Sequence, residues 1–146
     1  MKNRIFSWIY YEVSFFVALV AIITGLGTLV LGVEFNRQMG VQSGFHDPAL
    51  NFQIRHLGAI WFGYGWLILY CLRDLQQRYH LLNMALVVLA AGGIGRVITL
   101  IQFGLPEIMV GKILAVLSVT IALLLAPVMI FWSRRHFQQP LDETPK

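Results

Sequence analysis

The sequence predicts an all-α polytopic membrane protein, a four-transmembrane-helix bundle with both termini in the cytoplasm. Three observations lead to this prediction. Hydrophobic residues make up 58% of the 146 residues and charged residues only 12%, whereas a soluble domain carries about 25% charged residues. Four apolar runs are each long enough to cross a hydrocarbon core of about 30 Å, which takes roughly 20 helical residues. Lys and Arg gather at one side of these runs, as topology requires.

The first two runs predict two retained helices. The first run covers residues 13–33 without a charge, which is longer than the apolar region of about 7–15 residues in a cleaved signal peptide. The second run covers residues 54–72 and carries Arg55 and His56 at its start. Because Asp47 followed by Pro48 is typical of a helix N-cap and first position, this helix should begin near Pro48.

The third and fourth runs predict the second half of the bundle. Residues 81–103 contain Arg96, and Gly104 should end that helix, while Pro106 and Glu107 should open the next one. The last run, residues 108–132, should bend near Pro127. We therefore predict helices at about residues 12–33, 48–73, 81–103 and 106–132 of a domain of residues 1–132, followed by a polar cytoplasmic tail, residues 133–146.

The orientation follows from the positive-inside rule, which counts Lys and Arg in the flanks of the helices. The net charge of +4 does not predict nucleic-acid binding, because the basic residues are dispersed and form no stripe interleaved with aromatic residues. The predicted cytoplasmic side collects Lys2, Arg4, Arg73, Arg78, Arg134, Arg135 and Lys146, and the other side has Arg37, Arg55 and Lys112.

Arg96 is the strongest candidate for a site. A guanidinium at membrane depth costs several kcal/mol and is usually buried in protein or turned toward water. Arg96 extends to the outer head groups, forms a structural clamp with Glu34 or Glu107, or contacts a ligand. We predict a cationic pocket in the outer half for an anionic lipid or amphiphile, lined by Arg55, His56, Arg96, Glu107, Lys112, Tyr64 and Thr99.

Glycines next to these cations predict close helix contacts. Gly92 lies one turn before Arg96, and Gly95 precedes it directly, while Gly58 follows Arg55 by three residues. Small residues let membrane helices approach each other closely. We therefore assign Gly58, Gly92 and Gly95 to helix packing.

No motif in the chain demands catalysis. The four histidines show no metal-binding spacing, Cys71 is the single cysteine, and no nucleotide-binding loop or nucleophile elbow occurs. We therefore predict no catalytic residue, no metal and no cofactor.

Two segments resemble a known family. The residues Gln53-Ile54-Arg55-His56-Leu57-Gly58 form the first segment, and Gly95-Arg96-Val97-Ile98 with Phe103-Gly104-Leu105-Pro106 form the second. They resemble a bacterial family of small four-helix membrane proteins, domain of unknown function 4345, which is loosely similar to DoxX-like bundles. The resemblance covers about residues 12–132 and implies a four-span bundle in the bacterial inner membrane, with weight on Arg55, Gly58 and Arg96. It implies no activity.

Several functions fit these features. Our first hypothesis is a non-enzymatic accessory or ligand-binding bundle whose partners are the lipid bilayer and an anionic lipid or amphiphile. The alternatives are a subunit of a larger membrane complex, a small transporter formed by dimerisation, and a membrane enzyme that uses Arg96, Glu107 and His56. Nucleic acid is not expected as a partner.

Overall fold

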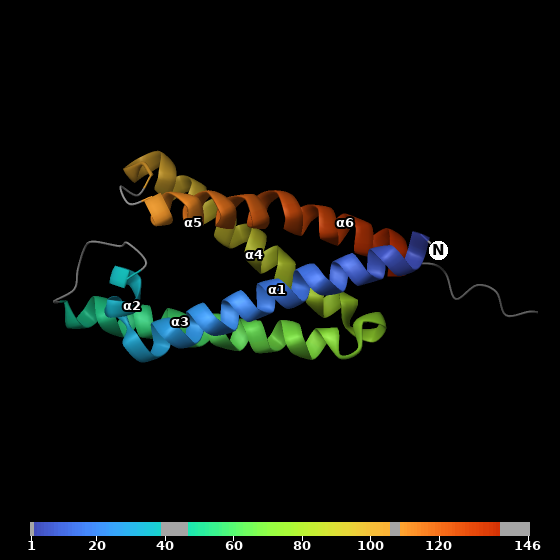
Figure 1. Cartoon of the computed structure of the whole chain (residues 1–146), viewed down its shortest axis with the longest axis horizontal. Coiled ribbons are helices and arrows are strands. Elements are labelled where there is room, and N and C mark those ends of the chain that lie inside the picture. Colours follow the sequence, from blue (N-terminus) through green and yellow to red (C-terminus); the bar gives the residue numbers. More distant parts are fainter. Residues whose placement is uncertain (1, 39–46, 106–108, 138–146) are drawn as a thin grey trace, which may run out of the picture.

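The computed structural model describes residues 2–38, 47–105 and 109–137, and in these residues all regular structure is helical. Three long helices, α1 (Lys2–Leu31), α3 (Pro48–Leu72) and α4 (Leu75–Phe103), run alternately in opposite directions (Figure 1). An interrupted helix then returns to the end of the molecule where α1 begins. The predicted all-α class is confirmed.

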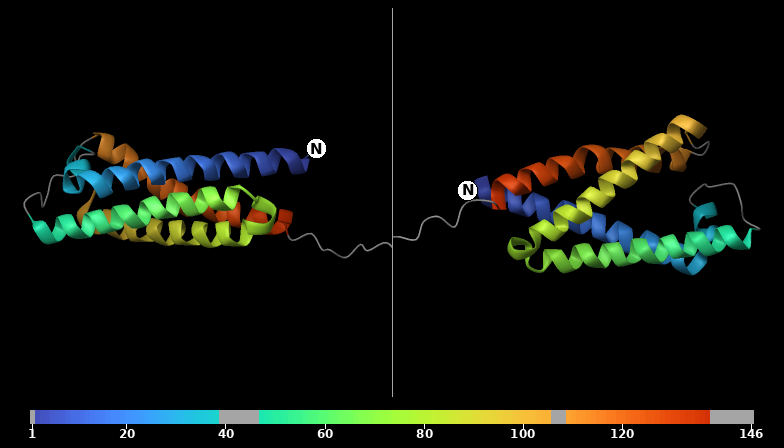
Figure 2. Two further views of the ribbon diagram at one scale, coloured as in Figure 1. Left: turned by 90° about the horizontal axis from the view of Figure 1, so that it is seen from below. Right: turned by 180° about the vertical axis from the view of Figure 1, so that it is seen from behind.

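Two hairpins make up the molecule. The first is α1 with α3, and the second is α4 with the interrupted helix. They meet at the end that holds the start of α1, which we call the terminal end, and diverge toward the opposite end, which we call the far end (Figure 2). The short helix α2 (Val33–Gln38) lies at the far end.

Helices α1 and α3 are in backbone contact. An added Cβ atom at Gly58 would lie 2.6 Å from the backbone nitrogen of Leu29, and one at Gly65 would lie 2.8 Å from the carbonyl oxygen of Ala18. Without these side chains the two backbones approach closely at Gly58 and at Gly65. The hairpin is therefore held by dense packing, with a hydrogen bond of 2.9 Å from Trp61 Nε1 to Thr24 Oγ1 added to it.

The helix ends follow local chemistry, and two of the helices begin earlier than predicted. Asp47 caps α3 and accepts from the amide of Ala49 at 2.9 Å, and Gly104, at φ +78°, ends α4. Helix α1 begins at Lys2 instead of residue 12, and α4 begins at Leu75 instead of residue 81. Asp74 caps that earlier start by accepting from the amide of Gln77.

The last helix is interrupted ahead of Pro127. It consists of α5 (Met109–Thr120), the π-helical segment η1 (Ile121–Leu125) and α6 (Ala126–Phe137). Proline cannot bond to the carbonyl four residues earlier and clashes with it, and the wider π turn, in which Ala126 donates to Ile121, accommodates that position. The predicted start of a tail at residue 133 is wrong, because α6 continues to Phe137 and Ser133 is buried. Pro106, Glu107 and residues 138–146 lie outside the described part.

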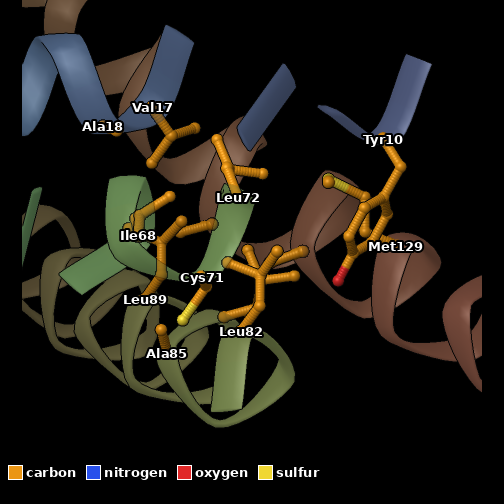
Figure 3. Packing of buried hydrophobic residues seen from close by; sticks show 13 residues of the cluster. Tyr10, Val17, Ala18, Ile68, Cys71, Leu72, Leu82, Ala85, Leu89 and Met129 are labelled. Carbon is orange, nitrogen blue, oxygen red and sulfur yellow. The ribbon is translucent and has the colours of Figure 1, made fainter. Parts of the chain in front are cut away.

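The core that joins the hairpins lies in the terminal half. Figure 3 shows Leu82, Ala85 and Leu89 of α4 next to side chains of α3. Because the helices separate beyond this cluster, the far half lacks an equivalent core among the described residues. The buried cluster consists of Tyr10, Val17, Ala18, Ile68, Cys71, Leu72, Leu82, Ala85, Leu86, Leu89, Ala122, Ala126 and Met129.

Three segments of the described residues are long and apolar enough to cross a membrane. They are Ser7–Leu31, Leu75–Gln102 and Gly111–Arg134, and they indicate a membrane protein. Helix α3 is not among them. Its mean hydropathy is lowered by Arg55 and His56 and by its glycines, tryptophans and tyrosines.

Candidate functional site

Arg55 binds the C-terminal end of α1. Its Nη1 donates to the carbonyl oxygens of Leu29 and Val30, at 3.0 and 2.7 Å. These carbonyls belong to the last turn, where helical partners are missing and the helix dipole places partial negative charge. The guanidinium therefore satisfies and neutralises the end of a neighbouring helix.

Asn51 completes this arrangement one turn before Arg55. Its Oδ1 accepts from Arg55 Nε and from the backbone amide of Val33, both at 3.3 Å. Gly32, at φ +61°, turns the chain out of α1 at this point, and an added Cβ there would collide with Asn51. The hydrogen bonds of Arg55 thus stabilise the fold, although its side chain is exposed.

Arg96 lies in a different environment. It stands seven residues after Leu89 and eleven after Ala85, so at 100° per residue it shares their face of α4 within about 20°. That face packs on α3 in the terminal half (Figure 3). In the far half α3 has diverged, and Arg96 is exposed and makes no hydrogen bond or ion pair with any described residue.

Tyr64 links the two hairpins where they begin to separate. Its hydroxyl donates to the carbonyl oxygen of Ala85 at 2.7 Å, and its ring stacks on Trp61 with centroids 5.0 Å apart. Thr99, one turn beyond Arg96, donates to the carbonyl of Gly95 in its own helix at 3.0 Å. Tyr64 is thus hydrogen-bonded to α4, while the Thr99 hydroxyl donates its proton within its own helix.

The other predicted site residues lie on separate elements. His56, on α3, and Lys112, on α5, are both exposed. Glu34 pairs with Arg37 at 3.5 Å, because the two are three residues apart on α2, so the expected clamp between Glu34 and Arg96 is absent. Glu107 lies outside the described residues.

The glycines of α4 are placed differently from the prediction. No atom of another described helix lies within 4 Å of an added Cβ at Gly92 or Gly95, and both are exposed. Gly93 instead faces η1, where an added Cβ would lie 2.6 Å from the Cβ of Ala122. One residue turns a helix by 100°, so Gly93 and not its neighbours makes the helix contact. Gly58 does pack, against α1.

Sequence inspection missed a buried polar network in the terminal half. Asn83 Oδ1 accepts from Tyr10 at 3.0 Å and from Ser133 at 2.8 Å, which joins α1, α4 and α6. Ser14, one turn after Tyr10, is buried and has no partner for its hydroxyl. None of these residues is charged and they are far apart in the chain, so only their position inside apolar helices could have signalled the network.

Comparison with known proteins places the chain by family alone. Among curated proteins and solved structures, no significant match is found. The sequence profile described as "Domain of unknown function (DUF4345)" matches residues 13–133, which is most of the chain. The chain therefore belongs to the DUF4345 family.

Proposed function

We propose that all four helical segments cross the membrane, with both termini in the cytoplasm. Helices α1 and α4 run in the same direction in the bundle, so if both cross, the chain between them has to return. Helix α3 is antiparallel to both and has 25 residues, enough for about 37 Å at 1.5 Å per residue. This topology supports α3 as the fourth span, despite its lower hydropathy.

The direction of insertion rests on the basic residues. The terminal end is the cytoplasmic one in this proposal, because seven Lys and Arg flank the helices there, from Lys2 to Lys146, against three at the other end. A plasma membrane of bacterial type and the likeness to DoxX-like bundles remain expectations from the sequence.

We further propose that the protein is a non-enzymatic bundle that binds an anionic amphiphile between its two hairpins in the far half. The observation that carries this proposal is the position of Arg96. It continues the α4 face that packs on α3, yet it has no partner among the described residues. A guanidinium facing a bilayer without a partner is costly, and a phosphate or carboxylate group bound between the hairpins would remove that cost.

The surroundings fit an amphiphile better than a free anion. Leu57 and Ile60, on the far half of α3, are exposed, and Leu100 follows Arg96 by one turn on the same side of α4. Lys112 and His56 stand toward the same end and add positive potential there. An acyl or other apolar body would contact the aliphatic side chains while its head group meets Arg96.

The test is the content of bound anionic lipid. The protein is purified in mild detergent, and its lipid is extracted and quantified for the wild type and for Arg96→Leu. Charge-assisted hydrogen bonds contribute about 1.5–3 kcal/mol, so binding should weaken about tenfold or more. Arg37→Leu, which removes an exposed cation that pairs with Glu34 at the same end, is the matched control. Unchanged lipid in a folded Arg96→Leu protein rejects the proposal.

A second candidate is a subunit of a larger membrane complex. The specific observation is the open space at Gly92 and Gly95, which lie exposed on a helix able to span the membrane. Small residues on such a surface allow a further helix to approach closely. Gly92→Leu should then release the partner in mild detergent, whereas a chain that purifies alone counts against this candidate and leaves lipid binding untouched.

A further inference from the structure

A groove separate from the Arg96 region runs between α4 and α6 in the terminal half. It is open on one side and has a volume of about 370 Å³, comparable with small ligand sites of about 300–1,000 Å³. Its lining consists of Val87, Ala90, Pro127, Ile130, Phe131 and Arg134.

The groove exists because the two helical segments touch on either side of it. Toward the far end, Gly93 allows η1 to approach α4 at Ala122. Toward the terminal end, Ser133 is 2.8 Å from Asn83. Between these two contacts stand Ala90 and Pro127, whose short side chains leave the space unfilled. The groove is thus fixed by contacts on both sides.

We propose that this groove binds one acyl chain of an anionic phospholipid, with the phosphate held by Arg134. Both helices belong to segments able to span a membrane, so the open side of the groove faces hydrocarbon. Its lining is apolar except for Arg134, and no lining residue carries a negative charge.

The position of Arg134 supports a phosphate partner. It is the last residue of the segment Gly111–Arg134, and its side chain is exposed, which suits the depth at which the chain leaves the hydrocarbon. It lies seven residues after Pro127, about 10 Å along the helix. A guanidinium binds phosphate through parallel hydrogen bonds. It repels the ammonium group of a zwitterionic head group, so the groove should favour an anionic lipid.

The experiment titrates the purified full chain with phosphatidylglycerol or phosphatidylcholine and follows bound lipid by native mass spectrometry. Ala90→Phe fills the groove, and Arg134→Gln removes its charge. Val88→Phe places the same phenyl group at an exposed position of α4 outside the groove, and Arg73→Gln removes a cation from the same end. Phosphatidylglycerol binding should fall about tenfold in the two groove variants and stay unchanged in the two controls.

The outcomes separate this site from the proposed function. Arg134→Gln should weaken phosphatidylglycerol binding in the groove. Arg96→Leu should leave that binding intact, because Arg96 lies in the other half of the bundle. Equal phosphatidylglycerol binding by wild type and Arg134→Gln would overturn the inference. So would conversion of a dimer to a monomer by Ala90→Phe without loss of lipid, because a second copy would then occupy the groove. If Ala90→Phe does not fold, Arg134→Gln decides alone, with phosphatidylcholine binding as its internal reference.

Discussion

Arg55 and Arg96 lie at about the same depth but have different surroundings. Each stands seven residues from the far end of its helix, about 10 Å along the axis. Arg55 uses three hydrogen bonds to hold Asn51 and the last turn of α1. Arg96 makes none with the described residues. We infer that Arg55 serves the fold, while Arg96 is available to a ligand.

This difference predicts separate effects on stability and on lipid content. Arg55→Ala leaves the Leu29 and Val30 carbonyls without their charged donor, and should lower the free energy of unfolding by about 1–2 kcal/mol. Thermal unfolding in detergent measures the loss, and Arg37→Ala, whose surface ion pair contributes about 0–1 kcal/mol, is the control. If Arg55→Ala is as stable as the control but has lost its lipid, the assignment of roles is wrong.

At the scale of elements, different contacts hold the two helices together in each hairpin. Backbone contact at Gly58 and Gly65 holds α1 to α3. The second hairpin relies on Gly93 and on the bond between Asn83 and Ser133. Without a strong hydrophobic force between helices in lipid, such close contacts and hydrogen bonds carry the association. The first hairpin should therefore be sensitive to any added side-chain atom at its interface.

Two glycines of α3 offer a matched test of this point. At Gly58 an added methyl group would collide with the backbone of α1, whereas at Gly63 no atom lies within 4 Å. Gly58→Ala should lower stability, because the helices have to separate. Gly63→Ala should be neutral or raise stability by up to about 1 kcal/mol, because alanine favours the helix. Thermal melts that show the same change for both variants would contradict backbone packing at Gly58.

The sequence allows helix ends to be predicted where capping chemistry is local. Asp47 with Pro48 and the stop at Gly104 were found this way. The start of α4 was placed six residues late because the prediction followed hydropathy. Polar residues such as Gln76 and Gln77 lower the hydropathy of the first turns of α4, so these turns were not recognised as helical. Asp74 caps them, and Tyr79 is buried there. Gly93 was missed because facing depends on the neighbouring helix, which one sequence does not reveal.

At the scale of the whole molecule, the surroundings of the predicted site residues could be foreseen only in part. The face of Arg96 followed from helical phase, because it depends on one helix. Two other features could not be predicted, because they depend on contacts between distant segments. They are the hydrogen bonds of Arg55 to α1 and the divergence of the hairpins in the far half. The same holds for the network of Tyr10, Asn83 and Ser133, which links α1, α4 and α6 in the terminal half.

The orientation of the bundle predicts which end reacts with a reagent that cannot cross membranes. In a Cys71→Ala background, Arg37→Cys lies on α2 at the far end and Gln77→Cys at the opposite end, and both positions are exposed. If the basic terminal end is cytoplasmic, a membrane-impermeant maleimide should label Arg37→Cys in intact cells and Gln77→Cys only after lysis.

The reverse pattern would place Arg96 in the cytoplasmic leaflet. Labelling of both cysteines in intact cells would mean that α3 does not cross, since only a returning α3 puts these residues on opposite sides. Either result would also change the leaflet from which the groove at Arg134 takes its lipid, because that lipid comes from the leaflet at the terminal end.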